Sequence, residues 1–231
     1  QVGKNEIAID LFEKAIRANP NEPDFYNNSG EAFRALKKYD QAIACYKQAL
    51  EINPGFAGAY NNFGNVLKEM GKLEEAIERY QQAIVVAPDF PIPYNNLGIV
   101  LKDLGRHSEA ISRYEQALSL LPDYAEAHSN LGNVLLELER EEDAIIHYQK
   151  ALAIMPGYAE AHSNLGNALR SLGRQTEAIK HYEQAIALRP DFAMAQYNMG
   201  IALDELGRPE DAIGCYESAI AINADYAEAY N

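Results

Sequence analysis

Cysteine and basic residues are scarce in this sequence. Its 231 residues include two cysteines, Cys45 and Cys215, which are too few for a disulfide framework. There are 20 lysines and arginines against 34 aspartates and glutamates, so the formal net charge is −14. A surface that binds nucleic-acid phosphates or anionic lipids needs a basic patch. The balance therefore argues against nucleic acid and membrane as partners.

Long apolar runs and targeting signals are missing as well. No stretch reaches the roughly eighteen consecutive apolar residues of a membrane-spanning helix. The first residues, QVGKNEIAIDLF, have neither the apolar core nor the cleavage site of a signal peptide, and no initiator methionine precedes them. We therefore expect an excerpt or a processed product of a longer chain. The unpaired cysteines and the missing signal favour a cytoplasmic location.

What the sequence contains is one unit copied six times. Apolar residues make up 48% of the chain, as is typical of a folded protein. A proline recurs at a constant interval of 34 residues, at Pro20, Pro54, Pro88, Pro122, Pro156 and Pro190. Further markers keep the same register: Gly30, Gly64, Gly98, Gly132, Gly166 and Gly200; Ala42, Ala76, Ala110, Ala144, Ala178 and Ala212; Tyr46, Tyr80, Tyr114, Tyr148, Tyr182 and Tyr216.

Within one unit the apolar residues follow the period of an α-helix twice. Tyr60, Phe63 and Leu67 fall at i, i+3 and i+7, and Ala76 and Tyr80 fall at i and i+4. This spacing predicts two amphipathic helices, each with one buried stripe. Such a pair cannot bury its stripe alone, so the units must stack into a solenoid with a continuous core.

The ends of the predicted helices carry suitable residues. Glycines that suit a left-handed residue follow the first helix of four units, at Gly71, Gly105, Gly173 and Gly207. Lys37 and Glu139 occupy the same position in two other units, and each should be strained by about 1 kcal/mol. The repeated proline ends each second helix. Carboxylates such as Glu74 and Glu177 fall where second helices begin, and they favour the macrodipole there.

A helix-turn-helix unit of this length, with Leu-Gly, Ala, Tyr, Ala and Pro markers, resembles the tetratricopeptide repeat. The resemblance implies an all-α fold, a right-handed α-solenoid superhelix. We expect six full repeats, at 23–56, 57–90, 91–124, 125–158, 159–192 and 193–226. Residues 1–22 should form the second helix of a truncated repeat, and residues 227–231 should begin another first helix.

One stretch, YAEAHSNLGN, occurs twice and contains the residue types of a hydrolase site. It spans residues 124–133 and 158–167. We interpret Asp123 as a helix N-cap and Glu126 as its partner in a capping box, a pair repeated by Asp225 and Glu228. Adjacent residues such as His128 and Ser129 point about 100° apart on a helix, which is unsuitable for nucleophilic catalysis. We therefore expect no enzymatic activity.

The histidines favour packing over chemistry. His128 and His162 stand where other repeats have tyrosine, on the buried stripe. They lie one repeat apart, about 8 to 10 Å if repeats advance by a helix-packing distance, which is too far for a shared metal ion. The same estimate separates His147 from His181. No glycine-rich phosphate loop is present. We expect neither a cofactor nor a metal site.

Asparagine recurs at one position of every repeat. The six residues, here called the ladder asparagines, are Asn28, Asn62, Asn96, Asn130, Asn164 and Asn198. They fall at about 200° from the core stripe on the helical wheel, and asparagine costs up to about 0.7 kcal/mol inside a helix. Stacked repeats would align their amides along the concave surface, where they could bind the backbone of an extended peptide. Asn65, Asn133 and Asn167 add amides on the same side.

Two interpretations of the ladder asparagines stay open. They could bind a peptide, or they could bond between adjacent first helices while their repetition records duplication. The phrases AYNNFGNVLKEMGKLEEAIERYQQAI and PDFPIPYNNLGIVLKDLGR are similar to the repeats of O-linked N-acetylglucosamine transferases. That resemblance implies that the ladder asparagines hold acceptor polypeptides in extended form, although no glycosyltransferase domain is present in these residues.

The leading hypothesis is a protein-interaction scaffold with a polypeptide partner in its concave groove. One alternative is self-association, because residues 227–231 begin a helix without its partner and leave the apolar end of repeat 193–226 uncapped. Another is the substrate-recruiting part of a larger glycosyltransferase. The family resemblance also excludes one type of binding site. In the family, a clamp for C-terminal carboxylates needs a lysine at the position that is held here by Asn27, Asn61, Asn95, Ser129, Ser163 and Tyr197.

Overall fold

The computed structural model describes the backbone of residues 2–223 and the side chains from residue 5 onward. In this part of the chain, thirteen α-helices follow one another and no strand occurs. The chain divides into two compact units, residues 1–121 and residues 122–231. The all-α repeat fold expected from the sequence is confirmed. The interpretations that involve Asp225, Glu228 and residues 227–231 lie outside the described residues.

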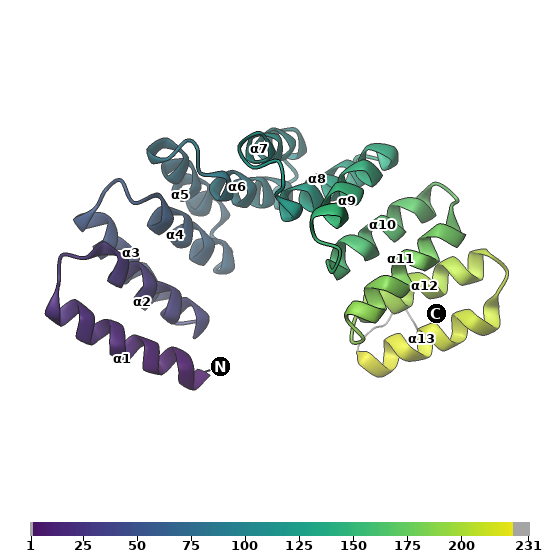
Figure 1. Ribbon diagram of the computed structural model, residues 1–231, viewed down its shortest axis with the longest axis horizontal. Helices are drawn as coiled ribbons and strands as arrows, with labels where there is room; N and C mark the ends of the chain where they lie inside the picture. The colour runs from purple at the N-terminus through teal and green to yellow at the C-terminus, as the bar shows by residue number, and fades with distance from the viewer. Residues whose placement is uncertain (1, 224–231) are drawn as a thin grey trace. The chain divides into compact units, whose positions relative to one another are not determined.

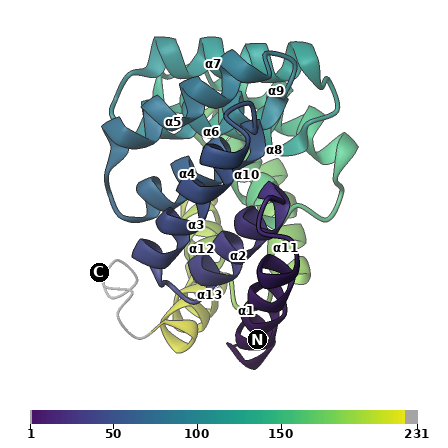
Figure 2. The ribbon, with the colours of Figure 1, turned by 90° about the vertical axis from the view of Figure 1, so that its left-hand side faces the viewer.

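The first unit contains seven helices (Figures 1 and 2). They are α1 (Val2–Ala18), α2 (Pro23–Ala35), α3 (Tyr39–Ile52), α4 (Ala57–Glu69), α5 (Leu73–Val86), α6 (Pro91–Asp103) and α7 (His107–Leu120). The most extensive packing joins α2 to α3, α4 to α5 and α6 to α7, the two helices of one repeat. The first helices α2, α4 and α6 also contact one another in turn.

The second unit, as far as residue 223, repeats this arrangement with six helices. They are α8 (Ala125–Glu137), α9 (Glu141–Ile154), α10 (Ala159–Ser171), α11 (Gln175–Leu188), α12 (Ala193–Glu205) and α13 (Pro209–Ile222). The pairs are α8 with α9, α10 with α11 and α12 with α13, and the first helices α8, α10 and α12 again lie in succession.

A glycine and a tyrosine set the approach of the two helices of each repeat. Five second-helix tyrosines are fully buried: Tyr46, Tyr80, Tyr114, Tyr148 and Tyr182. Each of the six marker glycines lies against the ring of its own repeat's tyrosine, so a Cβ there would come within 2.5 to 2.7 Å of a ring carbon. The absence of a side chain at these glycines therefore permits the close approach of the two helices.

The turns within the repeats have the expected left-handed backbone. The φ angles of Gly71, Gly105, Gly173 and Gly207 lie between 71° and 74°. Lys37 and Glu139 adopt the same region with φ of 57°, although neither is glycine. Both positions therefore carry the predicted strain.

The predicted capping box at Asp123 is wrong. Helix α8 begins at Ala125, its N-cap residue is Tyr124, and the N-cap makes no side-chain hydrogen bond. Asp123 therefore stands one residue before the position from which a side chain could cap the helix. An aromatic residue holds the N-cap position because it contributes to packing: Phe192, the N-cap of α12, packs with the buried alanines Ala159 and Ala185.

Candidate functional site

The ladder asparagines form two sections, one in each unit. Asn28, Asn62 and Asn96 lie on α2, α4 and α6, whereas Asn130, Asn164 and Asn198 lie on α8, α10 and α12. Asn28 is exposed, and the other five are half-buried. Because the first helices of a unit lie in succession, each section presents its amides along one row of helices.

In the first unit the ladder asparagines bond to the preceding repeat. The Asn62 Nδ2 donates to the Asn27 Oδ1 at 3.1 Å. The Asn96 Nδ2 donates to the Asn61 Oδ1 at 2.9 Å and lies 3.3 Å from the Asn65 Oδ1. Asn27 and Asn61 are buried, so these bonds satisfy polar atoms that water does not reach.

In the second unit the acceptor moves by one helical turn. Serine replaces the buried asparagine at Ser129 and Ser163. The Asn164 Nδ2 donates instead to the Asn133 Oδ1 at 2.9 Å, and the Asn198 Nδ2 donates to the Asn167 Oδ1 at 3.0 Å. Bonding between adjacent first helices, one of the two interpretations from the sequence, is therefore present in both units.

The additional asparagines also accept a bond from within their own repeat. The hydroxyl of Tyr80 donates to the Asn65 Oδ1 at 2.8 Å. The hydroxyls of Tyr148 and Tyr182 donate to Asn133 and Asn167 at 2.8 and 2.7 Å. These amide oxygens connect the second helix of one repeat to the first helix of the next. Sequence reasoning missed this role, although the constant interval of 15 residues between asparagine and tyrosine was a signal for it.

The interrepeat bonds leave part of three ladder amides, those of Asn62, Asn164 and Asn198, for a ligand. A carboxamide has two N–H donors and two acceptor lone pairs. Asn164 and Asn198 each use one N–H in their interrepeat bond. Asn62 also donates once, and its oxygen accepts a long bond of 3.3 Å from Asn61. Each of these amides is therefore held in one orientation with an N–H to spare.

Two pairs of histidines, here called the histidine pairs, meet inside repeats of the second unit. The Nδ1 atoms of His128 on α8 and His147 on α9 lie 3.0 Å apart. Those of His162 on α10 and His181 on α11 lie 3.2 Å apart. In each pair the first-helix ring also bonds through its Nε2 to a backbone carbonyl, of Pro122 or Pro156, at 3.1 Å.

Burial keeps three of these histidines in the neutral form near neutral pH. It is the main cause that lowers the pKa of His128 and of His181. Burial also lowers the pKa of His147 to about 4, and the His128 ring and the Lys150 ammonium add to this effect. Sequence reasoning compared histidines across repeats and missed these contacts within a repeat. Their signal was co-occurrence, because the two repeats with histidine on the first helix also have it on the second.

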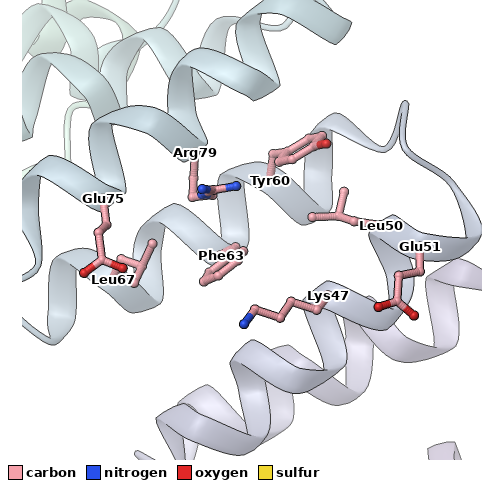
Figure 3. Close-up of a pocket in the computed structure, with 8 residues that line it drawn as sticks. All are labelled: Lys47, Leu50, Glu51, Tyr60, Phe63, Leu67, Glu75 and Arg79. Atoms are coloured by element: carbon pink, nitrogen blue, oxygen red, sulfur yellow. The ribbon is translucent and has the colours of Figure 1, made fainter.

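A cavity of about 410 Å³ opens between two repeats of the first unit. Figure 3 shows Lys47, Leu50 and Glu51 from α3 facing residues of α4 and α5 across it. The Arg79 guanidinium lies 5.4 Å from the centroid of the Phe63 ring at its floor. Tyr60 and Arg79 in this view occupy the positions that the histidine pairs hold in the second unit.

Ion pairs also join neighbouring first helices. The Arg34 Nη1 lies 2.6 Å from the Glu69 Oε1, and the Arg170 Nη1 lies 3.0 Å from the Glu205 Oε1. Arg34 also pairs with Glu31 on its own helix at 2.8 Å. The hydrogen bond to Glu31 is the main reason that the pKa of Arg34 is raised. These ion pairs therefore connect the same neighbouring first helices that the asparagine hydrogen bonds connect.

Other site types are not found in the described part of the chain. Residues 2–223 contain no group of three or more His, Cys, Asp or Glu side chains arranged to hold a metal ion. Cys45 and Cys215 are free thiols. Among the described helices, none is both long and apolar enough to cross a lipid bilayer.

The chain belongs to the tetratricopeptide repeat family. Profiles described as "Tetratricopeptide repeat" match residues 11–44, 89–157, 123–191 and 163–228, and one described as "TPR repeat" matches residues 30–71 and 64–105. Together these matches extend over nearly the whole sequence. A comparison with curated protein sequences finds no match for this chain.

Several solved structures have the same fold. The share of the solved chain that matches this sequence differs between them. The Cut9–Hcn1 structure of the APC/C matches 99% of this chain at a TM-score of 0.86, but the match covers 45% of that chain at 21% identity. YrrB, described as "a TPR protein with an unusual peptide-binding site", matches 80% of this chain and 95% of its own at 28% identity and a TM-score of 0.63. MamA matches 74% of this chain and 94% of its own at 26% identity and the same TM-score.

Proposed function

We propose that the chain is a protein-interaction scaffold that binds an extended polypeptide segment through its ladder asparagines and has no catalytic activity of its own. The observation that supports this proposal is that the amides of Asn62, Asn164 and Asn198 are held in one orientation and use only one N–H in doing so. A peptide unit offers one N–H and one C=O, which such an amide can complement. Because the interrepeat bonds already fix the side chains, binding costs them little conformational entropy.

The spacing of the rungs suits an extended chain. Neighbouring helices pack about 8 to 10 Å apart, and an extended peptide advances about 3.3 Å per residue. One rung therefore meets the peptide about every third residue. Such contacts bind backbone, so affinity depends on an extended conformation more than on side chains.

The structural neighbours support an interaction role. YrrB has a peptide-binding site on a repeat array that is 28% identical to this chain, and a similar use of the present array is the simplest extension. A narrower form of the proposal, from the resemblance to O-linked N-acetylglucosamine transferases, is recruitment of substrate polypeptides for a catalytic domain. A glycosyltransferase assay with an acceptor polypeptide, on the chain alone and with a separately supplied catalytic domain, tests that form directly. Self-association through residues 227–231 stays a prediction.

The ladder is tested by replacing Asn62 and Asn164 together with alanine. The probe is the tightest peptide selected from a displayed library of unstructured sequences, and its affinity is measured by calorimetry. Loss of two charge-neutral hydrogen bonds should weaken binding by about tenfold. A double variant that binds the peptide as tightly as the original chain would contradict the proposal, as would a library without any binder.

A matched control separates binding from folding. Asn61→Ser removes the acceptor used by Asn96 but leaves the ladder amide in place, and serine stands at the same position as Ser129 and Ser163. We expect this variant to bind the peptide within about twofold of the original chain. Thermal unfolding of all variants shows whether any loss of binding comes from loss of fold.

A further inference from the structure

We propose that each histidine pair is a binding site for a borderline divalent metal ion such as Zn²⁺, coordinated by the two facing Nδ1 atoms. The sites are His128 with His147 and His162 with His181, where the two Nδ1 atoms lie 3.0 and 3.2 Å apart. They lie in consecutive repeats of the second unit. The inference is independent of the ladder asparagines, so either proposal can fail without the other.

The first-helix histidine of each pair is already in the tautomer that binds a metal. The Nε2 atoms of His128 and His162 lie 3.1 Å from the carbonyl oxygens of Pro122 and Pro156. A carbonyl only accepts hydrogen bonds, so Nε2 carries the proton and Nδ1 carries a lone pair. A bond from the second ring nitrogen to a backbone carbonyl is the usual way in which proteins orient a metal-ligating histidine.

The distance between the two nitrogens is close to that of two ligands on one ion. Zn–N bonds of about 2.0 to 2.1 Å in tetrahedral geometry place two nitrogens about 3.3 Å apart. The rings of the two pairs are inclined at 36° and 28° with centroids 5.3 and 5.4 Å apart, so a small rotation turns both lone pairs toward a common point.

Binding needs no net release of protons. Without metal, the Nδ1–H of His147 donates to the Nδ1 of His128, so the Nε2 of His147 is unprotonated. On coordination this proton moves to the Nε2 of His147, and both Nδ1 lone pairs bind the ion. The same shift applies to His181.

Packing alone does not require histidine at these positions. In the third repeat the hydroxyl of Tyr94 donates to the Pro88 carbonyl at 3.0 Å, which is the bond that His128 makes to Pro122. Arg113 stands at the second-helix position of this repeat that His147 holds in the repeat of residues 125–158. Tyrosine therefore satisfies the carbonyl equally well, and the feature particular to the histidine repeats is a second nitrogen facing the first.

The surroundings permit access and leave coordination positions open. His147 and His181 are half-buried, so an ion can reach both pairs from solvent. One turn earlier on the same helices lie the carboxylates of Asp143 and Glu177. They form ion pairs with Arg140 and Arg174, so the positive charges of these two arginines are balanced near the histidine pairs. Two protein ligands leave the remaining positions for water or for a side chain of a bound partner.

The test is a titration of the purified, tag-free chain with ZnCl₂ at neutral pH. We expect two bound ions per chain and a shift of the Nδ1 resonances of the four paired histidines in nitrogen NMR spectra. His128→Tyr combined with His147→Arg, which reproduces the Tyr94 and Arg113 pair, should remove one ion. The corresponding change at His162 and His181 should remove the other ion. In the variant that lacks both pairs, the affinity for Zn²⁺ should fall by about tenfold or more relative to the original chain.

A fifth histidine provides the control. His107 lies at the start of α7, outside both pairs, and His107→Gln introduces the residue that stands at the same position as Gln175. This variant should retain both ions. The proposal is overturned if the variant without any histidine pair binds Zn²⁺ as tightly as the original chain, or if the Nδ1 resonances of the paired histidines do not shift on addition of Zn²⁺.

Discussion

Three second-helix tyrosines place the ring in the core and the hydroxyl against the first helix of the same repeat. The rings of Tyr80, Tyr148 and Tyr182 are fully buried, and each hydroxyl donates to an asparagine oxygen. Burial is the main cause that raises the pKa of all three hydroxyls above the ordinary value of 10.0. Ionisation of these tyrosines is therefore coupled to unfolding.

This coupling predicts a steep loss of stability in alkali. Above pH 10 the unfolded chain releases tyrosine protons that the folded chain retains, so the free energy of unfolding falls as pH rises. Each retained proton contributes about 1.4 kcal/mol per pH unit between the unfolded and folded pKa values. The measurement is chemical denaturation at several alkaline pH values, with tyrosinate absorbance recorded in parallel.

Tyr148→Phe is the matched variant for the alkaline prediction. It should reduce the pH slope by one proton equivalent, and it should lower stability at neutral pH by about 1 kcal/mol through loss of the bond to Asn133. Tyrosinate absorbance that develops fully before the chain unfolds would contradict the coupling.

For single residues, the sequence predicts which side chains are buried better than it predicts which side chains contact one another. The repeated period places Tyr148 and Gly132 in the core because their spacing alone defines the buried stripe. The contact between His128 and His147 could not be derived in the same way, because it depends on how far each helix is rotated about its axis. The capping prediction at Asp123 failed because α8 begins one residue later than expected, so Tyr124 stands at the N-cap position in place of Asp123.

Helix pairs depend on the glycine that faces each tyrosine. A Cβ at Gly132 would lie 2.7 Å from the Tyr148 ring, so even alanine forces the ring or the helix to move. Gly214 on α13 is also inside a helix, yet a Cβ there would meet nothing within 4 Å. The two positions share one backbone conformation and differ in the space around the side chain.

We therefore predict opposite effects for the same substitution. Gly132→Ala should destabilise the chain by about 1 kcal/mol, because overpacking of about 1 to 3 kcal/mol exceeds the helix-propensity gain of about 1 kcal/mol. Gly214→Ala should stabilise it by about 0.5 to 1 kcal/mol. Denaturant unfolding measures both, and effects of equal sign would show that the close approach does not limit stability.

At the scale of the whole molecule, the successive repeats of the second unit are joined by hydrogen bonds that use the same positions each time. Asn164 bonds to Asn133, and Asn198 bonds to Asn167 in the same way one repeat later. Removal of residues 159–192 would place Asn198 beside Asn133. The new hydrogen bond between repeats would then have its donor and acceptor at the same repeat positions as the two hydrogen bonds that it replaces.

We predict that the chain without residues 159–192 folds cooperatively. It should lose about 2 to 5 kcal/mol of stability, the share of one repeat at about 0.05 to 0.15 kcal/mol per residue. Removal of residues 159–174, which takes α10 and its turn alone, should abolish cooperative folding because α11 then lacks its partner. Calorimetry and circular dichroism distinguish the two outcomes. Equal stability of both deletions would contradict repeat-wise packing.

The fold of the whole chain follows from its period, whereas the use of its polar groups does not. Six copies of proline, glycine, alanine and tyrosine in one register determine which faces are buried, and the family assignment agrees. Whether a ladder asparagine such as Asn164 faces a ligand or its neighbour depends on the offset between adjacent helices. The sequence left both interpretations open, and the structure shows the bond to the neighbour while a second N–H stays available.

Because the contacts between neighbouring repeats are equivalent, they also affect how the length of such a chain can change in evolution. An exchange between two gene copies that align one repeat out of phase adds or removes a whole unit, and the product meets no unfamiliar interface. Length can therefore vary among descendants while each internal contact stays under the same selection.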